Sequence, residues 1–190
     1  MFCNLYLAYD YLSDGLKKIC DELIVIHSPK GVYGSSGTGG GGSKKSIVPA
    51  KGSRNMVKYT PEEMQAYINK ETEHPLVCVH HISGRKYLYI TGEYCIRFKG
   101  WTEEESKPLL DYLYQQATKP EMTCRFRWTK GAVALIDNRA AMHYAINDYA
   151  GYRREMYRLQ FQGPAPVGPA MPVRTQAELD ADRASLVLSD

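Results

Sequence analysis

TCRFRWTKGAVALIDNRAAMHYAINDYAGYRREMYRLQ, residues 123–160, contains four short runs rich in β-branched and aromatic residues. The runs lie at 123–128, 133–137, 142–146 and 154–160, and each has the length and composition of a β-strand. Lys130-Gly131 is expected to turn the chain between the first two runs. Several short strands joined by tight turns are typical of antiparallel β-structure.

The strand pattern continues toward the N-terminus. Residues 76–81 and 86–91 have the same composition, and Ser83-Gly84 is expected to join them as a hairpin. The sequence therefore predicts an antiparallel sheet, a sandwich or a barrel that carries a few helices.

Three helices are predicted from their first residues. Ser13 can cap a helix that ends near Leu23, because apolar residues follow it at helical spacing. Thr60, followed by a proline and then a glutamate at the third helical position, starts a capping box for a helix to about Lys70. Thr102 repeats this pattern ahead of a longer apolar stripe.

Composition narrows the class of protein. Of the 190 residues, 44 % are hydrophobic and 24 % charged, which is the balance of a globular domain. The formal net charge of +3 is too small for a protein built around nucleic-acid phosphates. The five cysteines are scattered without any Cys-x-x-Cys pair, which argues against a zinc knuckle or a disulfide framework. With no apolar window of roughly 18 residues, we expect a cytoplasmic protein without a membrane span.

Two segments differ from the rest in composition. Residues 31–59 are rich in glycine and serine and then basic, so we expect a flexible basic loop or lid. A phosphate-binding loop is disfavoured there because Gly-Lys-Ser/Thr is missing at the required spacing. We predict one domain over residues 1–162, followed by a Pro/Ala-rich, unpacked tail at 163–190, because proline cannot continue a strand ladder.

Arginines give the last predicted strand an unusual face. Strand alternation places Arg154, Met156 and Arg158 on one side. If that side faces a barrel interior, two guanidinium groups must meet anions, and a small dicarboxylate would satisfy them. The alternative is an arginine stripe that faces solvent, and spacing alone leaves both open. A strand histidine such as His143 is by residue type more often a hydrogen-bonded core or rim residue than a ligand.

The C-terminal third resembles the signature of the taurine dioxygenase (TauD/TfdA) family of Fe(II)- and 2-oxoglutarate-dependent dioxygenases. The matching residues are Trp128, Asp137-Asn138-Arg139, Met142-His143, Asp148-Tyr149 and Arg154-x-x-x-Arg158. Similar segments extend the resemblance over about residues 2–162, and the spacing between His143 and Arg154 is its most specific part.

The resemblance implies a mostly β fold with helices, an incomplete double-stranded β-helix of the jelly-roll, cupin-like type. His143 matches the family's distant metal ligand, and Arg154 matches the arginine that pairs with the distal carboxylate of 2-oxoglutarate. Arg158 matches an arginine that faces the substrate's anionic group. The implied cofactors are Fe(II), 2-oxoglutarate as co-substrate and O2, and the implied activity is oxidation of a small anionic organic substrate, a sulfonate or a carboxylate.

One family motif is missing from the sequence. The family's His-x-Asp/Glu pair lies upstream of the part that resembles Phe2 to Tyr9, and none of the five histidines here is followed two positions later by Asp or Glu. The chain thus looks like a member begun at an internal methionine, and we expect it to be catalytically incomplete. His80 or His81 could in principle replace a ligand, but adjacent strand residues face opposite ways, so at most one would point at the metal.

Two other functions stay open at this point. The chain could be a non-catalytic fragment that acts by associating with another chain, because removal of strands leaves open edges, and a homo-oligomer is open as well. Nucleic-acid binding through residues 31–59 is disfavoured because an aromatic platform is lacking there.

Overall fold

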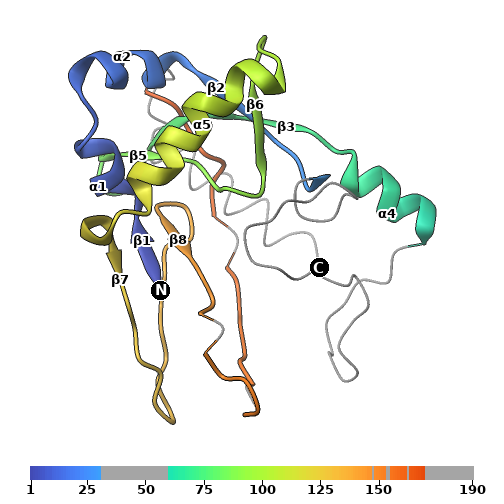
Figure 1. The fold of residues 1–190 in the computed structure, drawn as a ribbon, viewed down its shortest axis with the longest axis vertical. Helices are drawn as coiled ribbons and strands as arrows, with labels where there is room; N and C mark the ends of the chain where they lie inside the picture. The colour runs from blue at the N-terminus through green and yellow to red at the C-terminus, as the bar shows by residue number, and fades with distance from the viewer. Residues whose placement is uncertain (31–59, 147, 153–154, 162, 170–190) are drawn as a thin grey trace.

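The computed structural model describes residues 1–30, 60–146, 148–152, 155–161 and 163–169 (Figure 1). The predicted basic loop at 31–59 lies outside the described residues, so its flexibility stays a prediction.

The first sheet has the N-terminal strand at its centre. Strand β1 (Phe2–Asn4) pairs antiparallel with β7 (Thr123–Cys124) on one side and with β8 (Ala141–His143) on the other. Phe2 lies opposite both Cys124 and His143. Hydrogen bonds between Met1 and Tyr144 continue the pairing of β1 with β8 by one residue. This sheet therefore places His143 beside the start of the chain.

A second sheet and a hairpin form the rest of the β-structure. Strand β2 (Ile24–His27) is central, between β3 (Thr72–Pro75) and β6 (Cys95–Phe98), and all pairs are antiparallel. Strands β4 (Val77–Val79) and β5 (Lys86–Leu88) form the predicted hairpin. Its turn contains Gly84 at φ +67°, a left-handed conformation that glycine adopts without steric cost.

The helices begin where the sequence predicts. Helix α2 (Asp14–Glu22) is capped by Ser13, and α4 (Pro61–Ile68) and α5 (Glu103–Ala117) each have a complete capping box, formed by Thr60 and Thr102 respectively. Helix α1 (Leu5–Asp10), which Asn4 caps, and the short 3-10 helix η1 (Pro120–Met122) were not predicted from the sequence. None of the helices in the described ranges is long and apolar enough to cross a membrane.

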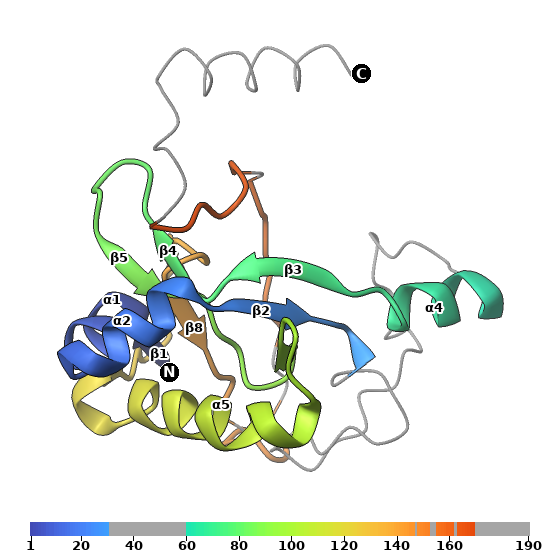
Figure 2. The ribbon, with the colours of Figure 1, turned by 90° about the horizontal axis from the view of Figure 1, so that it is seen from above.

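The hydrophobic core lies where α1 and α5 pack on the strands, while α4 lies apart at the start of β3 (Figures 1 and 2). Fully buried side chains from distant segments meet in it: Leu5, Val25, Leu76, Leu88, Phe98 and Leu113. Burial of each such side chain contributes roughly 1.5–3 kcal/mol. Helices α1 and α5 therefore share one hydrophobic core with strands of the second sheet and the β4–β5 hairpin.

Several predicted strands are shorter than expected or do not form. The run at 76–81 ends as a strand at Val79, and the run at 123–128 ends at Cys124. No strand forms at 133–137 or at the described residues 155–160, so the predicted hairpin at Lys130-Gly131 is only a turn between unpaired segments. A strand needs a neighbour for its backbone hydrogen bonds, and the described residues provide none at these positions. The composition of these runs is right for strands, but no strand in the described part of the chain pairs with them.

Part of the proline-rich segment is packed, contrary to expectation. The backbone N–H of Val79 donates to the carbonyl of Val167 at 2.8 Å, and Gly168 is buried against Pro75. Proline lacks a donor, but residues beside it still offer carbonyl acceptors to the edge of β4. Residues 170–190 lie outside the described residues, and the domain end at residue 162 stays a prediction.

Candidate functional site

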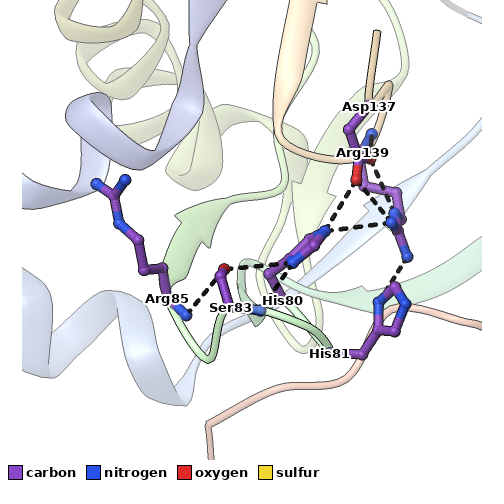
Figure 3. A network of polar contacts seen from close by, with 6 residues as sticks. All are labelled: His80, His81, Ser83, Arg85, Asp137 and Arg139. Atoms are coloured by element: carbon purple, nitrogen blue, oxygen red, sulfur yellow. Dashed lines mark hydrogen bonds and ion pairs between the residues drawn. The ribbon is translucent and has the colours of Figure 1, made fainter. Parts of the chain in front are cut away.

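A polar network joins the β4–β5 turn to the loop before β8 (Figure 3). At its centre, the guanidinium of Arg139 donates to both carboxylate oxygens of Asp137, with Nε to Oδ1 at 2.9 Å and Nη2 to Oδ2 at 2.6 Å. The backbone N–H of Arg139 also donates to Oδ1 at 3.0 Å. This bidentate pairing fixes the conformation of the loop that leads to His143.

Two histidines converge on this ion pair. Nε2 of His80 lies 2.8 Å from Oδ2 of Asp137, and Nδ1 of His81 lies 2.8 Å from Nη1 of Arg139. The expectation that adjacent histidines would face opposite ways is wrong here, because β4 ends at Val79 and both residues belong to the turn. Neither histidine is therefore directed away from the network.

The network also has a serine, but its geometry is that of a structural contact. The backbone N–H and the hydroxyl of Ser83 both lie 3.3 Å from Nδ1 of His80, which is 8 % exposed. Asp137 is bound on both oxygens by Arg139, so its charge is balanced without His80. The Ser83, His80 and Asp137 side chains therefore tie two loops together and do not form a nucleophile with its base.

Charge pairing in the network is strong. Hydrogen bonds from Arg139, and then from His80, hold the pKa of Asp137 well below its usual range. The hydrogen bond to Asp137 in turn raises the pKa of Arg139. The ion pair is therefore charged throughout the physiological pH range.

His143, the predicted metal ligand, lies at the end of β8 with its side chain exposed. The anchored Arg139 is four residues before it, and β1 holds its backbone in register through Phe2. Among the described residues, no three His, Cys, Asp or Glu side chains are grouped so that they could hold a metal ion. The described part of the chain therefore does not fit a complete iron site.

The other predicted site residues are not brought together with His143. Arg154 lies outside the described residues, and Arg158 is exposed in a segment that forms no strand. The predicted common face of these arginines is thus untested. Trp128, one of the residues that carry the family resemblance, is partly exposed and packs edge-on against Phe126, with ring centroids 4.9 Å apart.

A second histidine cluster lies in the β3-β2-β6 sheet, and the sequence analysis did not single it out. His27 stacks on Tyr89 at 5.2 Å between ring centroids and meets His74 edge-on at 5.0 Å. Its Nε2 lies 3.3 Å from Sγ of Cys95, the residue opposite it on β6. Burial, and then the nearby His74, lower the pKa of His27 to about 4. His27, His74 and Cys95 come from three paired strands and Tyr89 follows β5, so no local pattern could have identified the cluster.

Comparison with known proteins gives a consistent result. Residues 1–160 match the model of the family described as taurine catabolism dioxygenase TauD, TfdA family. The alpha-ketoglutarate-dependent sulfate ester dioxygenase of Pseudomonas putida is 36 % identical over 168 residues, which cover 88 % of this chain and 51 % of that protein. The alkylsulfatase of Acinetobacter baylyi is 32 % identical over 167 residues, covering 88 % and 48 %.

Solved structures agree with the sequence matches. The crystal structure of a taurine dioxygenase from Burkholderia xenovorans superposes with a TM-score of 0.59 at 32 % identity, covering 88 % of this chain and 48 % of that one. A second structure, AAD-2 in complex with Mn(II) and N-oxalylglycine, gives a TM-score of 0.52 at 27 % identity, covering 74 % and 47 %. The predicted fold class is confirmed as part of a jelly-roll of this type.

These matches also show how much of its relatives' length this chain spans. The chain spans about half the length of the curated relatives it matches. Within that half, the family model covers residues 1–160, including β1 and His143. The chain belongs to the TauD/TfdA family of dioxygenases.

Proposed function

We propose that this chain contributes to a 2-oxoglutarate-dependent dioxygenase that oxidises a small organic sulfate ester or sulfonate. The observation that carries the proposal is the 36 % identity over 168 residues to a sulfate ester dioxygenase. The match to an alkylsulfatase supports the same substrate class. Both names describe anionic esters of sulfur oxyacids, and a cationic side chain is the ordinary partner of such groups.

Three residues carry the proposed binding roles. His143 would be one metal ligand, Arg154 would bind the distal carboxylate of 2-oxoglutarate, and Arg158 would face the sulfur oxyanion of the substrate. A guanidinium suits the last two roles because its planar donors match two oxygens at once. The described residues do not complete an iron site, so the family's Fe(II) would need further ligands from outside them.

The position of the Asp137–Arg139 pair supports the proposed role of His143 as a metal ligand. It fixes the loop immediately before β8, and β8 carries His143 against the central strand β1. A ligand must be held within a few tenths of an ångström to be useful, so a ligand on a strand anchored at both ends suits the role.

The first test uses the purified 190-residue chain. With Fe(II), 2-oxoglutarate and O2, we expect no succinate above a control that contains iron alone, because the sequence has no His-x-Asp/Glu pair. Loss of a single outer partner of a metal ligand already costs roughly 10- to 100-fold in affinity, and loss of ligands themselves costs more. Turnover at an ordinary enzymatic rate by this chain would show that other residues hold the metal, and His80 and His81 would be tested first.

The second test supplies the missing ligands. The chain is extended at its N-terminus with a family segment that carries His-x-Asp, and succinate formation is measured with an alkyl sulfate as substrate. We expect turnover, and we expect His143→Ala and Arg154→Ala to abolish it. Arg85→Ala, which removes an exposed ion pair with Asp10, is the matched control and should leave turnover unchanged. An extended protein whose His143→Ala variant retains full activity would contradict the proposal.

The substrate class is tested separately. Arg158→Ala in the extended protein should raise KM for an alkyl sulfate while KM for 2-oxoglutarate stays the same. A preference for phenoxyacetates over alkyl sulfates would instead favour a carboxylate substrate.

A further inference from the structure

A segment toward the C-terminus, residues 163–169, lies along the edge of β4 that β5 does not occupy, and we call it the strap. The backbone N–H of Val79 donates to the carbonyl of Val167 at 2.8 Å. In Figure 2 the last described residues, coloured red-orange, run to β4. Residues 164, 166 and 169 are prolines, which have no N–H to donate, so the strap closes on β4 without extending the sheet.

The end of the strap packs so closely that it leaves no room for a side chain. Gly168 is buried, and a β-carbon on it would lie 3.0 Å from Cβ and 3.1 Å from Cγ of Pro75. Gly168 does not have a positive φ, so the need for glycine comes from space and not from backbone conformation. Pro75 ends β3 and Val77 begins β4, so this contact fixes the strap at the junction of two strands.

The start of the strap lies beside the guanidinium of Arg139. A β-carbon on Gly163 would lie 3.7 Å from Nη1 of Arg139. The same nitrogen lies 2.8 Å from Nδ1 of His81 in the β4–β5 turn. The strap therefore meets the polar network of Figure 3 at its arginine, and at its other end it meets β4, which leads into that network.

Contacts continue from the strap to the start of β8. Val79 directly precedes His80, whose Nε2 lies 2.8 Å from Oδ2 of Asp137. Beyond the network, the carbonyl of Ala140 accepts a hydrogen bond from the N–H of Leu5 at 3.0 Å, and Ala140 is only 4 % exposed. Strand β8 begins at the next residue, so the strap and β8 are joined by a continuous series of contacts.

Burial alone does not hold the ion pair of the network in place. The side chains of Arg139 and Asp137 keep 26 % and 40 % of their surface exposed. Water competes for both charges at such exposure, so a bidentate geometry persists only where surrounding groups limit the freedom of both side chains. The strap is one of these groups, because it lies beside the guanidinium.

We propose that the strap is a positioning segment for the loop before β8, and that this role depends on Gly168. By closing on β4 and lying beside Arg139, the strap keeps residues 137–140 in one conformation. Gly168 acts through these neighbours and is therefore a positioning residue. The inference rests on the proposed function for the role of His143 on β8, but it concerns the order of the loop and not turnover.

The test compares Gly168→Val with Ala165→Val in the full 190-residue chain by amide hydrogen exchange. Ala165 is exposed in the same strap, so Ala165→Val is the matched control and should exchange as the unaltered chain does. The amides of Arg139 and Leu5 report on the loop, because they donate to Oδ1 of Asp137 and to the carbonyl of residue 140. In Gly168→Val they should exchange at least about 10-fold faster, because release of the strap relieves the overpacked contact. Amides of α5 should keep their rates in both variants.

A second readout follows the side chain of Arg139. Its Nε–H donates to Oδ1 of Asp137 at 2.9 Å, and this hydrogen bond slows exchange of the proton with water, which NMR measures. The proton should stay protected in Ala165→Val and exchange at least about 10-fold faster in Gly168→Val. Gly168→Ala, which adds a single carbon, should show the same pattern with a smaller increase, so the test does not depend on folding of the valine variant.

Three results would overturn the inference. Faster exchange confined to Val79 and the strap would show that the loop is held without the strap. Equal acceleration in α5 would show that Gly168 supports the whole fold and not this loop, and equal acceleration by Ala165→Val would show that the contact with Pro75 is not the cause. If the loop responds as expected while the N-terminally extended protein forms no succinate, the proposed function fails and the positioning role of the strap stands.

Discussion

Acidification is expected to destabilise the fold through His27. The pKa of this residue is lowered from 6.5 to about 4, first by burial and then by His74. The unfolded chain therefore takes up a proton at a pH where the folded chain does not, so stability is complete above pH 6.5 and falls as the pH drops toward 4. At pH 5 the difference between the two pKa values corresponds to a loss on the order of 2 kcal/mol.

Burial and His74 lower the pKa of His27, and they outweigh a hydrogen bond to the backbone of Tyr89, which raises it. The neighbours of His27 are Cys95, Tyr89 and His74, and none is an anion that would stabilise the protonated ring. Burial lowers the pKa of His74 as well, so His74 adds to the loss with the same sign.

Urea unfolding followed by circular dichroism at pH 7 and pH 5 measures this loss. His27→Gln keeps a polar side chain but removes the titrating ring. Between pH 7 and pH 5, the variant should therefore lose less free energy of unfolding than the unaltered chain, by on the order of 2 kcal/mol. Ile82→Gln serves as the control, because Ile82 is exposed and carries no titratable group, and its loss of stability should equal that of the unaltered chain. If His27→Gln and the unaltered chain lose the same stability, the argument from burial of His27 is refuted.

Three further substitutions test the fold. Arg139→Ala removes the bidentate partner of the Asp137 carboxylate and should lower the free energy of unfolding by about 1–3 kcal/mol, measured by urea unfolding. Arg85→Ala, at an exposed ion pair, should lower it by at most about 1 kcal/mol. Equal losses in the two variants would contradict a role for the network. Gly84→Ala should lower the free energy of unfolding by about 1–2 kcal/mol because Gly84 has a positive φ. Gly15→Ala, in α2 with open space around it, should raise the free energy of unfolding by up to about 1 kcal/mol. A change of the same sign in both variants would contradict these two arguments. Thr102→Ala removes the capping box of α5 and should lower the free energy of unfolding by about 1 kcal/mol, and unchanged stability would show that the cap is dispensable.

Features set by neighbouring residues could be predicted from the sequence. The caps at Ser13, Thr60 and Thr102 are formed within three residues, and the hairpin at Gly84 depends on one turn. The family itself was recognised from motif residues and is confirmed by the match over residues 1–160.

Features that depend on distant residues could not be predicted from the sequence. Residues 133–137 have strand composition, but no local pattern reveals whether a neighbouring strand is present. His80 and Arg139 are 59 residues apart, and only the folded chain brings them to hydrogen-bonding distance. The three-residue strand β1 was missed because it is too short to show alternation.

Strand β1 is synthesised before both of its partners, yet it occupies the middle of its sheet. Its partners at 123–124 and 141–143 emerge only after most of the chain has been synthesised. Closing a contact across 143 residues, as between Met1 and Tyr144, is slow relative to closing the β4–β5 hairpin. Nascent chains arrested before residue 123 would therefore hold residues 2–4 without β7 or β8 to pair with, and we expect these residues to be a binding site for chaperones during translation.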